Sequence, residues 1–292
     1  MDSVNLKAPA KINLYLRVLD KRPDGYHNID SLMQTISLFD ELILERSDKI
    51  DLLCPDLENL PIEHNLAYRA AKMVAEMAYF PGVRISLKKN IPPQAGLGGG
   101  SADAAFVIRG LIKLYDLYLD KKELVKNSAI LGADIPFYLG SGQAHVTGIG
   151  EIVKPCALPY HYNIIIVKPP LAVETAKAYE GFDQVKSGKF CLTNDNEFLL
   201  FQQIISDQDF IRSANHFSND LEEVVFSWHH ELRQIKRELK QLGAFYAGMS
   251  GSGSAVFGLF SPERDIEETA NMFDVDRNKV FICKPVLLPP VN

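Results

Sequence analysis

Residues 92–105 have the sequence PPQAGLGGGSADAA, and this stretch decides the fold more than any other. Ser101 is a suitable N-cap residue, Asp103 falls in the first turn, and the following AAFVIRGLIKLY predicts a helix over 101–117. The start of a helix presents unpaired N–H groups and the positive end of the helix dipole, and both favour a bound anion. Four residues of the stretch lack a Cβ atom and let a ligand approach the backbone: Gly96, Gly98, Gly99 and Gly100. We therefore predict a phosphate-binding loop before this helix.

Two other glycine-rich motifs fit this stretch less well. A dinucleotide-binding fingerprint needs GxGxxG, and Ser101 stands where its third glycine would be. A Walker A loop ends in GK[ST], and the stretch contains no lysine. A flexible glycine turn between a strand and a helix remains an alternative. Glycines this dense, directly before a capped helix, favour the phosphate cradle.

The composition is that of a globular protein with a sizeable core. The 292 residues, 47% hydrophobic and 23% charged, are enough for two ordinary domains. The net charge is −6 and the lysines and arginines are scattered, so we expect no nucleic-acid partner. The four cysteines lie far apart without a CxxC pair, which favours free thiols in a reducing compartment. The first residues lack a targeting pattern and no apolar run approaches the ~20 residues that cross a bilayer, so we expect a cytoplasmic protein without a membrane partner.

Hydrophobic periodicity predicts a mixture of strands and helices in the first half. Residues 10–18 alternate like a half-buried strand, which puts Lys11 and Asn13 side by side on its more polar face. Residues 65–78 have helical spacing, and Asn65 stands where an N-cap belongs. The other predicted elements of this half are strands at 32–44 and 83–89 and a helix at 121–131.

The pattern weakens around residues 150–160, where we place a domain boundary. The predicted domains are 1–155 and 156–292. Because antiparallel strand pairs alternate with helices, we expect an α+β fold rather than a doubly wound one. The second half is predicted to hold strands at 163–167, 244–249, 255–260 and 279–284 and helices at 197–206, 218–226 and 228–242.

GLGGGSADAA resembles the phosphate-binding motif of GHMP kinases, which include galactokinase, homoserine kinase and mevalonate kinase. Further family-like segments follow in family order over nearly the whole chain: PAKINL at 9–14, DGYHNI at 24–29, LGADIPF at 131–137, NDLE at 219–222 and MSGSGSAVFG at 249–258. Together they are most similar to the branch whose acceptor is 4-diphosphocytidyl-2-C-methyl-D-erythritol, in the non-mevalonate route to isoprenoids. The resemblance implies a two-domain GHMP kinase fold with mixed and antiparallel sheets, and an ATP- and Mg²⁺-dependent kinase whose first domain binds the nucleotide.

The resemblance also implies the catalytic residues. Asp134 matches the general base that takes the proton of the acceptor hydroxyl, and Lys11 matches the residue that assists it at the acceptor oxygen. Phosphoryl transfer needs side chains for these two tasks. Each has a plainer alternative. Asp134 precedes Ile135-Pro136 and could simply cap the next short helix, and Lys11 could be a solvated lysine.

Other matched positions would bind the two substrates. Tyr26 and His27 would grip the cytosine, with Tyr179 as a second aromatic clamp and Asn13 beside Lys11 in the substrate site. Their alternatives are loop plugging after the turn at 23–25 and core packing. The expected ATP contacts are Pro93, Gly96, Leu97, Gly98, Gly99, Gly100 and Ser101 in the loop, with Asn65 and Lys89 at the adenine. The last two could instead be a helix cap and a solvated lysine.

A loop near the end of the chain would support the phosphate loop. Ser250, Gly251 and Ser252 match the third family motif, although a tight hairpin would also explain them. Asn219 and Asp220 of NDLE are sufficiently explained as caps of the next helix. Ala102 stands where the family usually has a second serine, so the metal contacts stay unassigned.

Two other functions compete with this one. A GHMP kinase for another alcohol would have no need of the base-reading pair in DGYH. A non-catalytic nucleotide sensor would have lost Asp134 or Lys11, and both are present.

Overall fold

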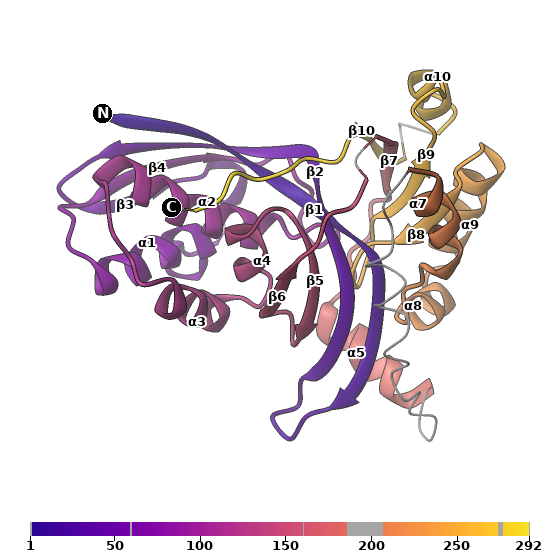
Figure 1. Ribbon diagram of the computed structural model, residues 1–292, viewed down its shortest axis with the longest axis horizontal. Helices are drawn as coiled ribbons and strands as arrows, with labels where there is room; N and C mark the ends of the chain where they lie inside the picture. Colours follow the sequence, from indigo (N-terminus) through magenta and orange to yellow (C-terminus); the bar gives the residue numbers. More distant parts are fainter. Residues whose placement is uncertain (1, 59, 160, 186–206, 274–276, 292) are drawn as a thin grey trace.

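The computed structural model describes residues 2–58, 60–159, 161–185, 207–273 and 277–291. Within these residues the chain forms two lobes side by side, each built on one β-sheet with helices packed on it (Figure 1). The first sheet is mixed and the second antiparallel, so the predicted α+β class is confirmed. The helix predicted at 197–206 lies outside the described residues. No described helix is both long enough and apolar enough to cross a membrane.

The first sheet is organised around one long central strand, β2. One edge of β2 pairs antiparallel with β1 along nearly its whole length. The other edge pairs with β5 over residues 29–34 and with β4 over residues 41–46, both antiparallel, and β3 runs parallel to β4. The strands are β1 (Ser3–Lys21), β2 (His27–Arg46), β3 (Ile50–Leu53), β4 (Val83–Lys88), β5 (Gln143–Gly148) and β6 (Ile152–Pro155).

The sequence predicts that residues 10–18 form a half-buried strand, and this prediction is wrong for the polar face that carries Lys11 and Asn13. Lys11 and Asn13 are only 4% and 2% exposed, and their apolar neighbours are buried too. The reason is that the free edge of β1 is covered by segments distant in sequence. The Lys11 N–H donates to the Leu97 carbonyl at 2.9 Å, and the Asn13 N–H donates to Ser250 Oγ at 3.4 Å. The strand is therefore the buried wall of a site.

Four helices cover one face of the first sheet: α1 (Leu66–Met77), α2 (Gly99–Tyr115), α3 (Lys121–Leu131) and α4 (Ile135–Leu139). Short 3₁₀ turns η1 (Pro55–Leu57) and η2 (Ile62–His64) precede them. Helix α1 buries Ala67, Ala70, Ala71 and Val74, the i, i+3, i+4, i+7 stripe of an amphipathic helix. Asn65 is its N-cap as predicted, because Oδ1 accepts the N–H of Ala67 at 2.9 Å.

The predicted N-cap of α2 is wrong. Helix α2 begins at Gly99, two residues before Ser101, and its N-cap is Gly98 in the left-handed region with φ of 71°. A Cβ atom at Gly98 would overlap the Tyr138 hydroxyl and lie 3.0 Å from Lys11 Cγ. Only glycine combines this backbone angle with this close packing, so the helix starts where the loop is tightest.

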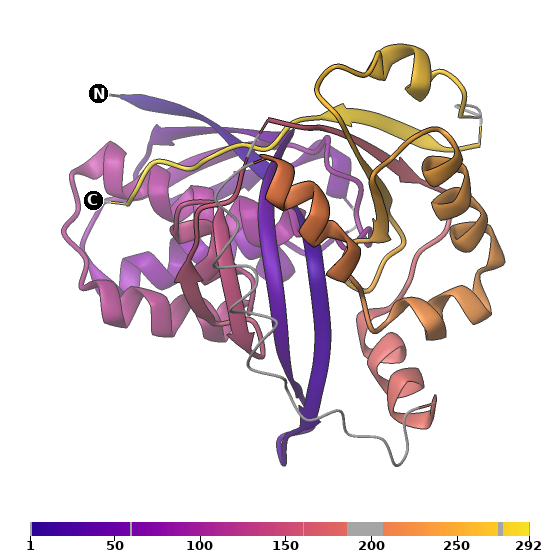
Figure 2. The same cartoon turned by 45° about the vertical axis from the view of Figure 1, so that its right-hand side comes forward.

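The second sheet has the order β10-β7-β9-β8 and is antiparallel throughout. Side chains of β9 alternate between two cores: Phe257 packs with Phe210 of α7 on one face, and Phe260 with Leu239 of α9 on the other. The two helices therefore cover opposite faces (Figure 2). The strands are β7 (Asn163–Lys168), β8 (Tyr246–Met249), β9 (Val256–Phe260) and β10 (Lys279–Cys283), and the helical segments are α5 (Thr175–Val185), α7 (Asp207–Ser213), η3 (Ala214–His216), α8 (Glu222–Trp228), α9 (His230–Gln241) and α10 (Ile266–Ala270).

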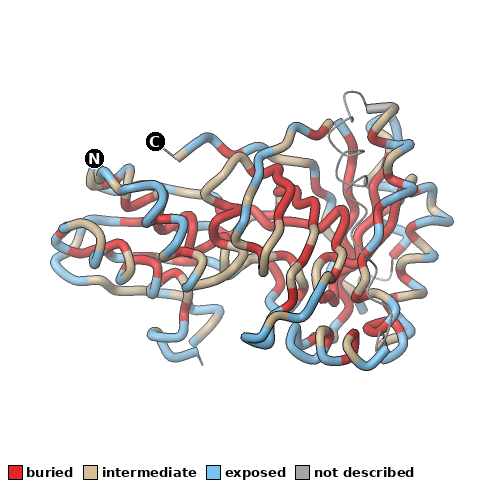
Figure 3. The backbone as a smooth tube through the Cα atoms, turned by 60° about the horizontal axis from the view of Figure 1, so that its bottom comes forward, coloured by how far each residue is buried: buried red, intermediate tan, exposed pale blue. Residues whose placement is uncertain are grey.

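A shared core joins the two lobes. Ile12 and Leu14 of β1 pack in one cluster with Ile164 and Phe257 of the second sheet. In Figure 3 the buried stretches gather along the long strands and where the lobes meet.

The end of the chain crosses back onto the first lobe (Figure 1). The Val286 N–H donates to the Thr35 carbonyl at 2.9 Å, and the Leu288 N–H donates to the Ser141 carbonyl at 2.8 Å. The change from one sheet to the other falls between β6 and β7. The division into domains 1–155 and 156–292 stays a prediction.

Candidate functional site

One large cavity lies where β1, the loop before α2, helix α5 and the loop after β8 come together. Its volume is about 1370 Å³, which is room for two substrates of nucleotide size. Of the residues that the sequence assigns to catalysis, to the two substrates or to the supporting loop, the cavity wall contains all but Ser250. Positions spread from residue 11 to residue 252 are thus brought to one place.

Lys11 and Asp134 face each other in the cavity wall. Lys11 Nζ lies 3.8 Å from Asp134 Oδ2 and donates to Asn13 Oδ1 at 2.5 Å. Burial lowers the pKa of the Lys11 ammonium, and the charge of Asp134 partly opposes this shift. Asp134 occupies the N-cap position of α4, yet its side chain makes no capping hydrogen bond there and remains 29% exposed. The simple capping role is therefore not what this carboxylate performs, and its oxygen atoms are accessible to a ligand hydroxyl.

The orientation of the Asn13 side chain is fixed by the hydrogen bond that its side-chain amide donates. Its Nδ2 donates to Ser31 Oγ at 2.8 Å, and Ser31 Oγ donates to the Tyr15 carbonyl at 2.7 Å. The orientation of Asn13 leaves Oδ1 pointing to Lys11. The buried lysine is thereby held in position by β1 and β2 even without a ligand.

The loop that precedes α2, which we call the glycine loop (residues 92–98), has the backbone shape expected of an anion site. Gly96 and Gly98 both have φ of 71°, and the chain then enters α2 at Gly99. The glycine loop and the helix start line the cavity beside Lys11, whose N–H is bonded to the Leu97 carbonyl. Unpaired amides at the start of a 17-residue helix suit the phosphate groups of a nucleotide.

The loop after β8 supports the glycine loop from behind, as the sequence predicts for its packing. Ser250 Oγ donates to the Gly96 carbonyl at 2.8 Å, and the Ala255 N–H donates to the Ala95 carbonyl at 3.1 Å. Ser250 is fully buried, while Gly251 and Ser252 reach the cavity. The two loops are therefore joined by one side-chain and one backbone hydrogen bond, and they lie so close that a Cβ atom on Gly96 would overlap the Ser250 carbonyl oxygen.

Asn219 has a larger role than the predicted helix cap. Its Nδ2 donates to the carbonyls of Met249 at 2.8 Å and Gly251 at 2.7 Å, and thus holds the start of the supporting loop, residues 250–255. Helix α8 starts only at Glu222, with Leu221 at its N-cap position. Asp220 accepts the Val18 N–H at 3.0 Å, which ties the same segment to β1. The polar pair in NDLE was the available signal for this anchoring.

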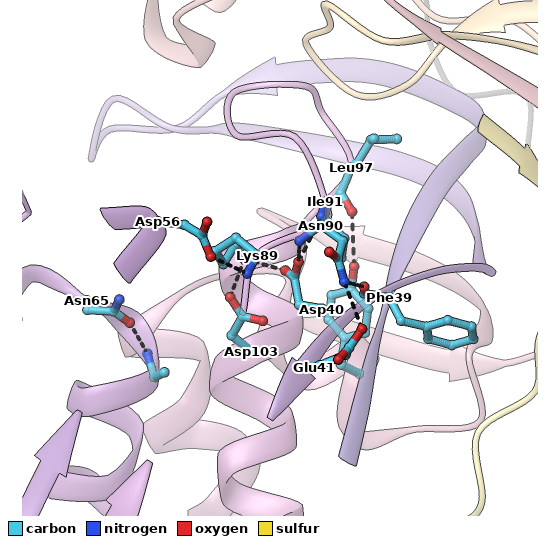
Figure 4. Close-up of polar contacts among 12 residues, drawn as sticks. Phe39, Asp40, Glu41, Asp56, Asn65, Lys89, Asn90, Ile91, Leu97 and Asp103 are labelled. Atoms are coloured by element: carbon cyan, nitrogen blue, oxygen red, sulfur yellow. Dashed lines mark hydrogen bonds and ion pairs between the residues drawn. The ribbon is translucent and has the colours of Figure 1, made fainter. Parts of the chain in front are cut away.

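Asn65 and Lys89 lie in the part of the cavity wall formed by the start of α1 and the end of β4 (Figure 4). Asn65 both caps α1 and lines the cavity, so its two readings are compatible. The reading of Lys89 as a solvated lysine is wrong, because its side chain is only 12% exposed and its ammonium is bonded to Asp40 and Asp103. Both carboxylates were missed by the sequence interpretation, since neither partner is near Lys89 in the chain.

Three aromatic side chains gather at the other end of the cavity. The rings of His27 and Tyr179 are stacked with centroids 5.2 Å apart, and Tyr26 next to them is 62% exposed. Burial raises the pKa of the Tyr179 hydroxyl, with the charge of Asp134 adding to it. An exposed ring beside a stacked pair does not plug the loop after the turn. It is available for a planar ligand.

Asp183 of α5 connects these aromatic residues to the β1–β2 hairpin, and the sequence interpretation did not find it. His27 Nε2 lies 2.7 Å from Asp183 Oδ1, and Lys21 Nζ donates to Oδ2 at 2.6 Å. Desolvation would raise the pKa of the Asp183 carboxyl, but the hydrogen bonds from Lys21 and His27 lower it below its usual value. Its spacing of four residues from Tyr179 was the signal, because i and i+4 share a helix face.

The described residues contain no group of three or more metal-ligating side chains arranged around a common point. A magnesium ion at this site would therefore be held mainly by substrate phosphates and water, as is usual for this ion. Ser101 lines the cavity and Ala102 is buried. The chemistry of the donors fits a nucleotide-borne ion rather than a protein-built metal centre.

Comparison with known proteins identifies the family of the chain. Residues 65–142 match the model of the GHMP kinases N terminal domain, and residues 205–274 match that of the GHMP kinases C terminal. A 4-diphosphocytidyl-2-C-methyl-D-erythritol kinase from Caldicellulosiruptor saccharolyticus is 39% identical over 285 residues, covering 97% of this chain and 95% of that protein. One with the same name from Syntrophus aciditrophicus is 40% identical, covering 96% and 98%.

Solved structures give the same result. The crystal structure of a 4-(cytidine 5'-diphospho)-2C-methyl-D-erythritol kinase superposes with a TM-score of 0.79 at 34% identity, covering 97% of this chain and 99% of that one. A homoserine kinase from Cytophaga hutchinsonii superposes with a TM-score of 0.74 at 18% identity, covering 98% and 95%. The second likeness speaks for the fold alone.

Proposed function

Because the chain belongs to the 4-diphosphocytidyl-2-C-methyl-D-erythritol kinase family of GHMP kinases, we propose that it transfers the γ-phosphate of ATP to the 2-hydroxyl of 4-diphosphocytidyl-2-C-methyl-D-erythritol. The observation that carries the proposal is the placement of Lys11 and Asp134 in the wall of one cavity that the glycine loop also lines. An acceptor hydroxyl between them would face the terminal phosphate of a nucleotide held by the loop.

Asp134 is the residue that would take the proton of the acceptor hydroxyl. Its carboxylate is partly exposed to the cavity and is not used as a helix cap, so it is available for this task. Lys11 would hold the acceptor oxygen and the developing charge on the phosphate. Because the Lys11 ammonium is buried, its interaction with that charge is stronger than it would be in water.

The glycine loop and the start of α2 would bind the ATP phosphates through backbone amides. We assign Pro93, Leu97 and Ser101 to the same nucleotide site, with Asn65 and the backbone of Lys89 near the base. Magnesium bound to ATP would shield the phosphate charge. No residue of the chain is assigned to it.

The cytidine end of the acceptor would bind at Tyr26, His27 and Tyr179. Stacking on an aromatic ring is worth about 1–3 kcal/mol per base, so Tyr26 alone would contribute usefully to affinity. The hydrogen bond that Asp183 Oδ1 accepts from His27 fixes this ring, and this keeps the stacked pair in place before the ligand arrives.

A substrate panel tests the proposed function. Purified protein is incubated with ATP, Mg²⁺ and either the cytidylylated acceptor, mevalonate, galactose or homoserine, and ADP release is followed. We expect release with the cytidylylated acceptor only. Turnover of another alcohol instead would assign a different GHMP kinase activity, and ATP binding without turnover of any alcohol would assign a nucleotide sensor.

The proposal includes a cytoplasmic location, where ATP is available. It is supported by the free thiols of Cys54, Cys156 and Cys283, which fit a reducing compartment.

A further inference from the structure

Three ionisable side chains form a buried cluster behind the glycine loop (Figure 4). Lys89 follows β4, and its ammonium is bonded both to Asp40 of β2 and to Asp103 of α2. The side chains of Lys89, Asp40 and Asp103 are 12%, 0% and 4% exposed. No ordinary solvated ion pair is this deeply enclosed.

Each carboxylate of the cluster is attached to one end of the glycine loop. Asp40 Oδ1 accepts the N–H groups of Asn90 at 2.6 Å and Ile91 at 2.8 Å, which are the residues that lead into the loop. Asp103 lies one turn into α2, the helix that leaves the loop. A Cβ atom on Gly99 would lie 3.4 Å from Lys89 Nζ, so the ammonium is directly behind the first residue of α2. One ammonium thus connects the entry and the exit of the loop.

The arrangement is not a simple stability device. One ammonium faces two carboxylates, and buried charges pay a desolvation penalty that apolar residues of the same size would avoid. Burial raises the pKa of Asp103 to about 8, with Lys89 opposing the rise and Asp40 adding to it. Neighbouring elements face the cluster with Asp56, whose carboxylate accepts the Lys89 N–H at 2.9 Å, and with Cys54 and Tyr138. Asp103 Oδ1 has no hydrogen-bond partner in the part of the chain that is described.

We propose that Lys89 is a positioning residue for ATP: by joining Asp40 to Asp103 it fixes the two ends of the glycine loop at the spacing that presents the first amides of α2 to the nucleotide phosphates. The inference rests on the proposed function in one respect, because it takes ATP to be the ligand of this loop. It makes no use of the acceptor, and Lys11 and Asp134 are not involved.

Lys89→Met, which keeps the length of the side chain and removes its charge, is the decisive variant. Lys88→Met is the matched control, because Lys88 is the preceding residue, its side chain is 65% exposed, and its nearest carboxylate, Glu41, is 3.5 Å away. We expect Lys89→Met to raise the Kd for Mg-ATP about 10-fold or more, and Lys88→Met to change it less than about twofold. The KM for the acceptor should stay unchanged in both, since the acceptor lies across the cavity.

Hydrogen exchange of the ligand-free protein gives a readout independent of activity. Amides of residues 90–99 should exchange faster in Lys89→Met than in wild type, while those of β8 and β9 should not change. Asp103→Asn keeps the shape of the cluster and weakens one arm, so an intermediate Kd is expected if Lys89→Met does not fold.

The inference would be overturned if Lys89→Met bound ATP as tightly as wild type and its residues 90–99 exchanged at the wild-type rate. If Lys89→Met does not fold, the same result in Asp103→Asn would overturn it. Equal losses of affinity for ATP and acceptor would also overturn it, because they would indicate general damage. A protein that binds ATP with the expected differences but phosphorylates no alcohol would contradict the proposed function and leave this inference standing.

Discussion

Replacing Gly96 by alanine tests whether the glycine loop is shaped by its packing against the supporting loop. Gly96 has φ of 71°, and an alanine in that region costs about 1–2 kcal/mol. Its Cβ atom would overlap the Ser250 carbonyl oxygen and lie 2.9 Å from the carbonyl carbon and 3.1 Å from Gly253 N. All three atoms belong to backbone, which cannot rotate aside as a side chain can. Overpacking of this kind costs about 1–3 kcal/mol more, so we expect Gly96→Ala to lower the free energy of unfolding by about 2–5 kcal/mol.

Urea unfolding of Gly96→Ala and Gly100→Ala, followed by circular dichroism, measures this difference. Gly100 is the matched control because it belongs to the same glycine run but lies within α2, and the nearest atom to its Cβ would be Leu66 Cδ1 at 3.5 Å. Alanine is a better helix former than glycine by about 0.5–1 kcal/mol, so Gly100→Ala should be as stable as wild type or slightly more stable. Gly96→Ala should also bind Mg-ATP more weakly, since its loop must move away from Ser250.

Equal stability of Gly96→Ala and Gly100→Ala would refute the reasoning. It would mean that the two loops separate without cost, and that Gly96 serves only the approach of a ligand. A Gly96→Ala protein that is destabilised yet binds ATP normally would show that the packing of the two loops contributes to folding and not to ATP binding.

Three other predictions concern single side chains. Asp134→Asn should lower kcat by ~10²-fold or more with little change in KM, because the amide cannot take the proton of the acceptor hydroxyl. Steady-state kinetics measure both constants, and a near-normal kcat would show that Asp134 is not the general base. Tyr26→Ala should raise the KM for the cytidylylated acceptor about 5- to 150-fold, as expected for ~1–3 kcal/mol of stacking. Tyr79→Ala removes a ring that is 89% exposed and absent from the cavity wall, and it should leave this KM unchanged; equal KM values for the two variants would put the cytosine elsewhere. For Asp103, the folded pKa of about 8 lies above the unfolded value of about 4, so the folded state holds an extra proton between these limits and its stability falls as pH rises through this window. Urea unfolding at pH 6 and pH 9 should therefore show Asp103→Asn gaining on wild type at pH 9, and parallel curves would contradict the shift.

The elements with strong local signals could be predicted from the sequence. The apolar stripe of α1 and the Asn65 cap are both local patterns, and both are confirmed by the structure. Helix α5 was missed because its buried residues, Ala178, Gly181 and Phe182, are few and two of them are weakly hydrophobic. Because this helix was not predicted, Asp183 could not be placed on the same helix face as Tyr179.

The candidate site could be predicted only as far as motifs extend. Lys11, Asp134 and the glycine loop were found because each lies in a recognisable segment, whereas the burial of Lys11 was not foreseen. An alternating strand looks half-solvated when the segments that cover its edge come from residues 97 and 250. The partners of Lys89 were invisible for the same reason, because Asp40 precedes it by 49 positions. Long-range pairing has no local period to detect.

The return of the chain end onto the first lobe has a consequence for biosynthesis. Residues 286 and 288 supply N–H donors to carbonyl groups of Thr35 and Ser141, so the first lobe is completed by residues that follow the whole second sheet in the chain. Domains generally fold in order as the ribosome delivers them. The first lobe therefore completes its hydrogen bonding only when residues 286 and 288 have been synthesised, and a nascent chain stalled before residue 286 would carry an unfinished first lobe.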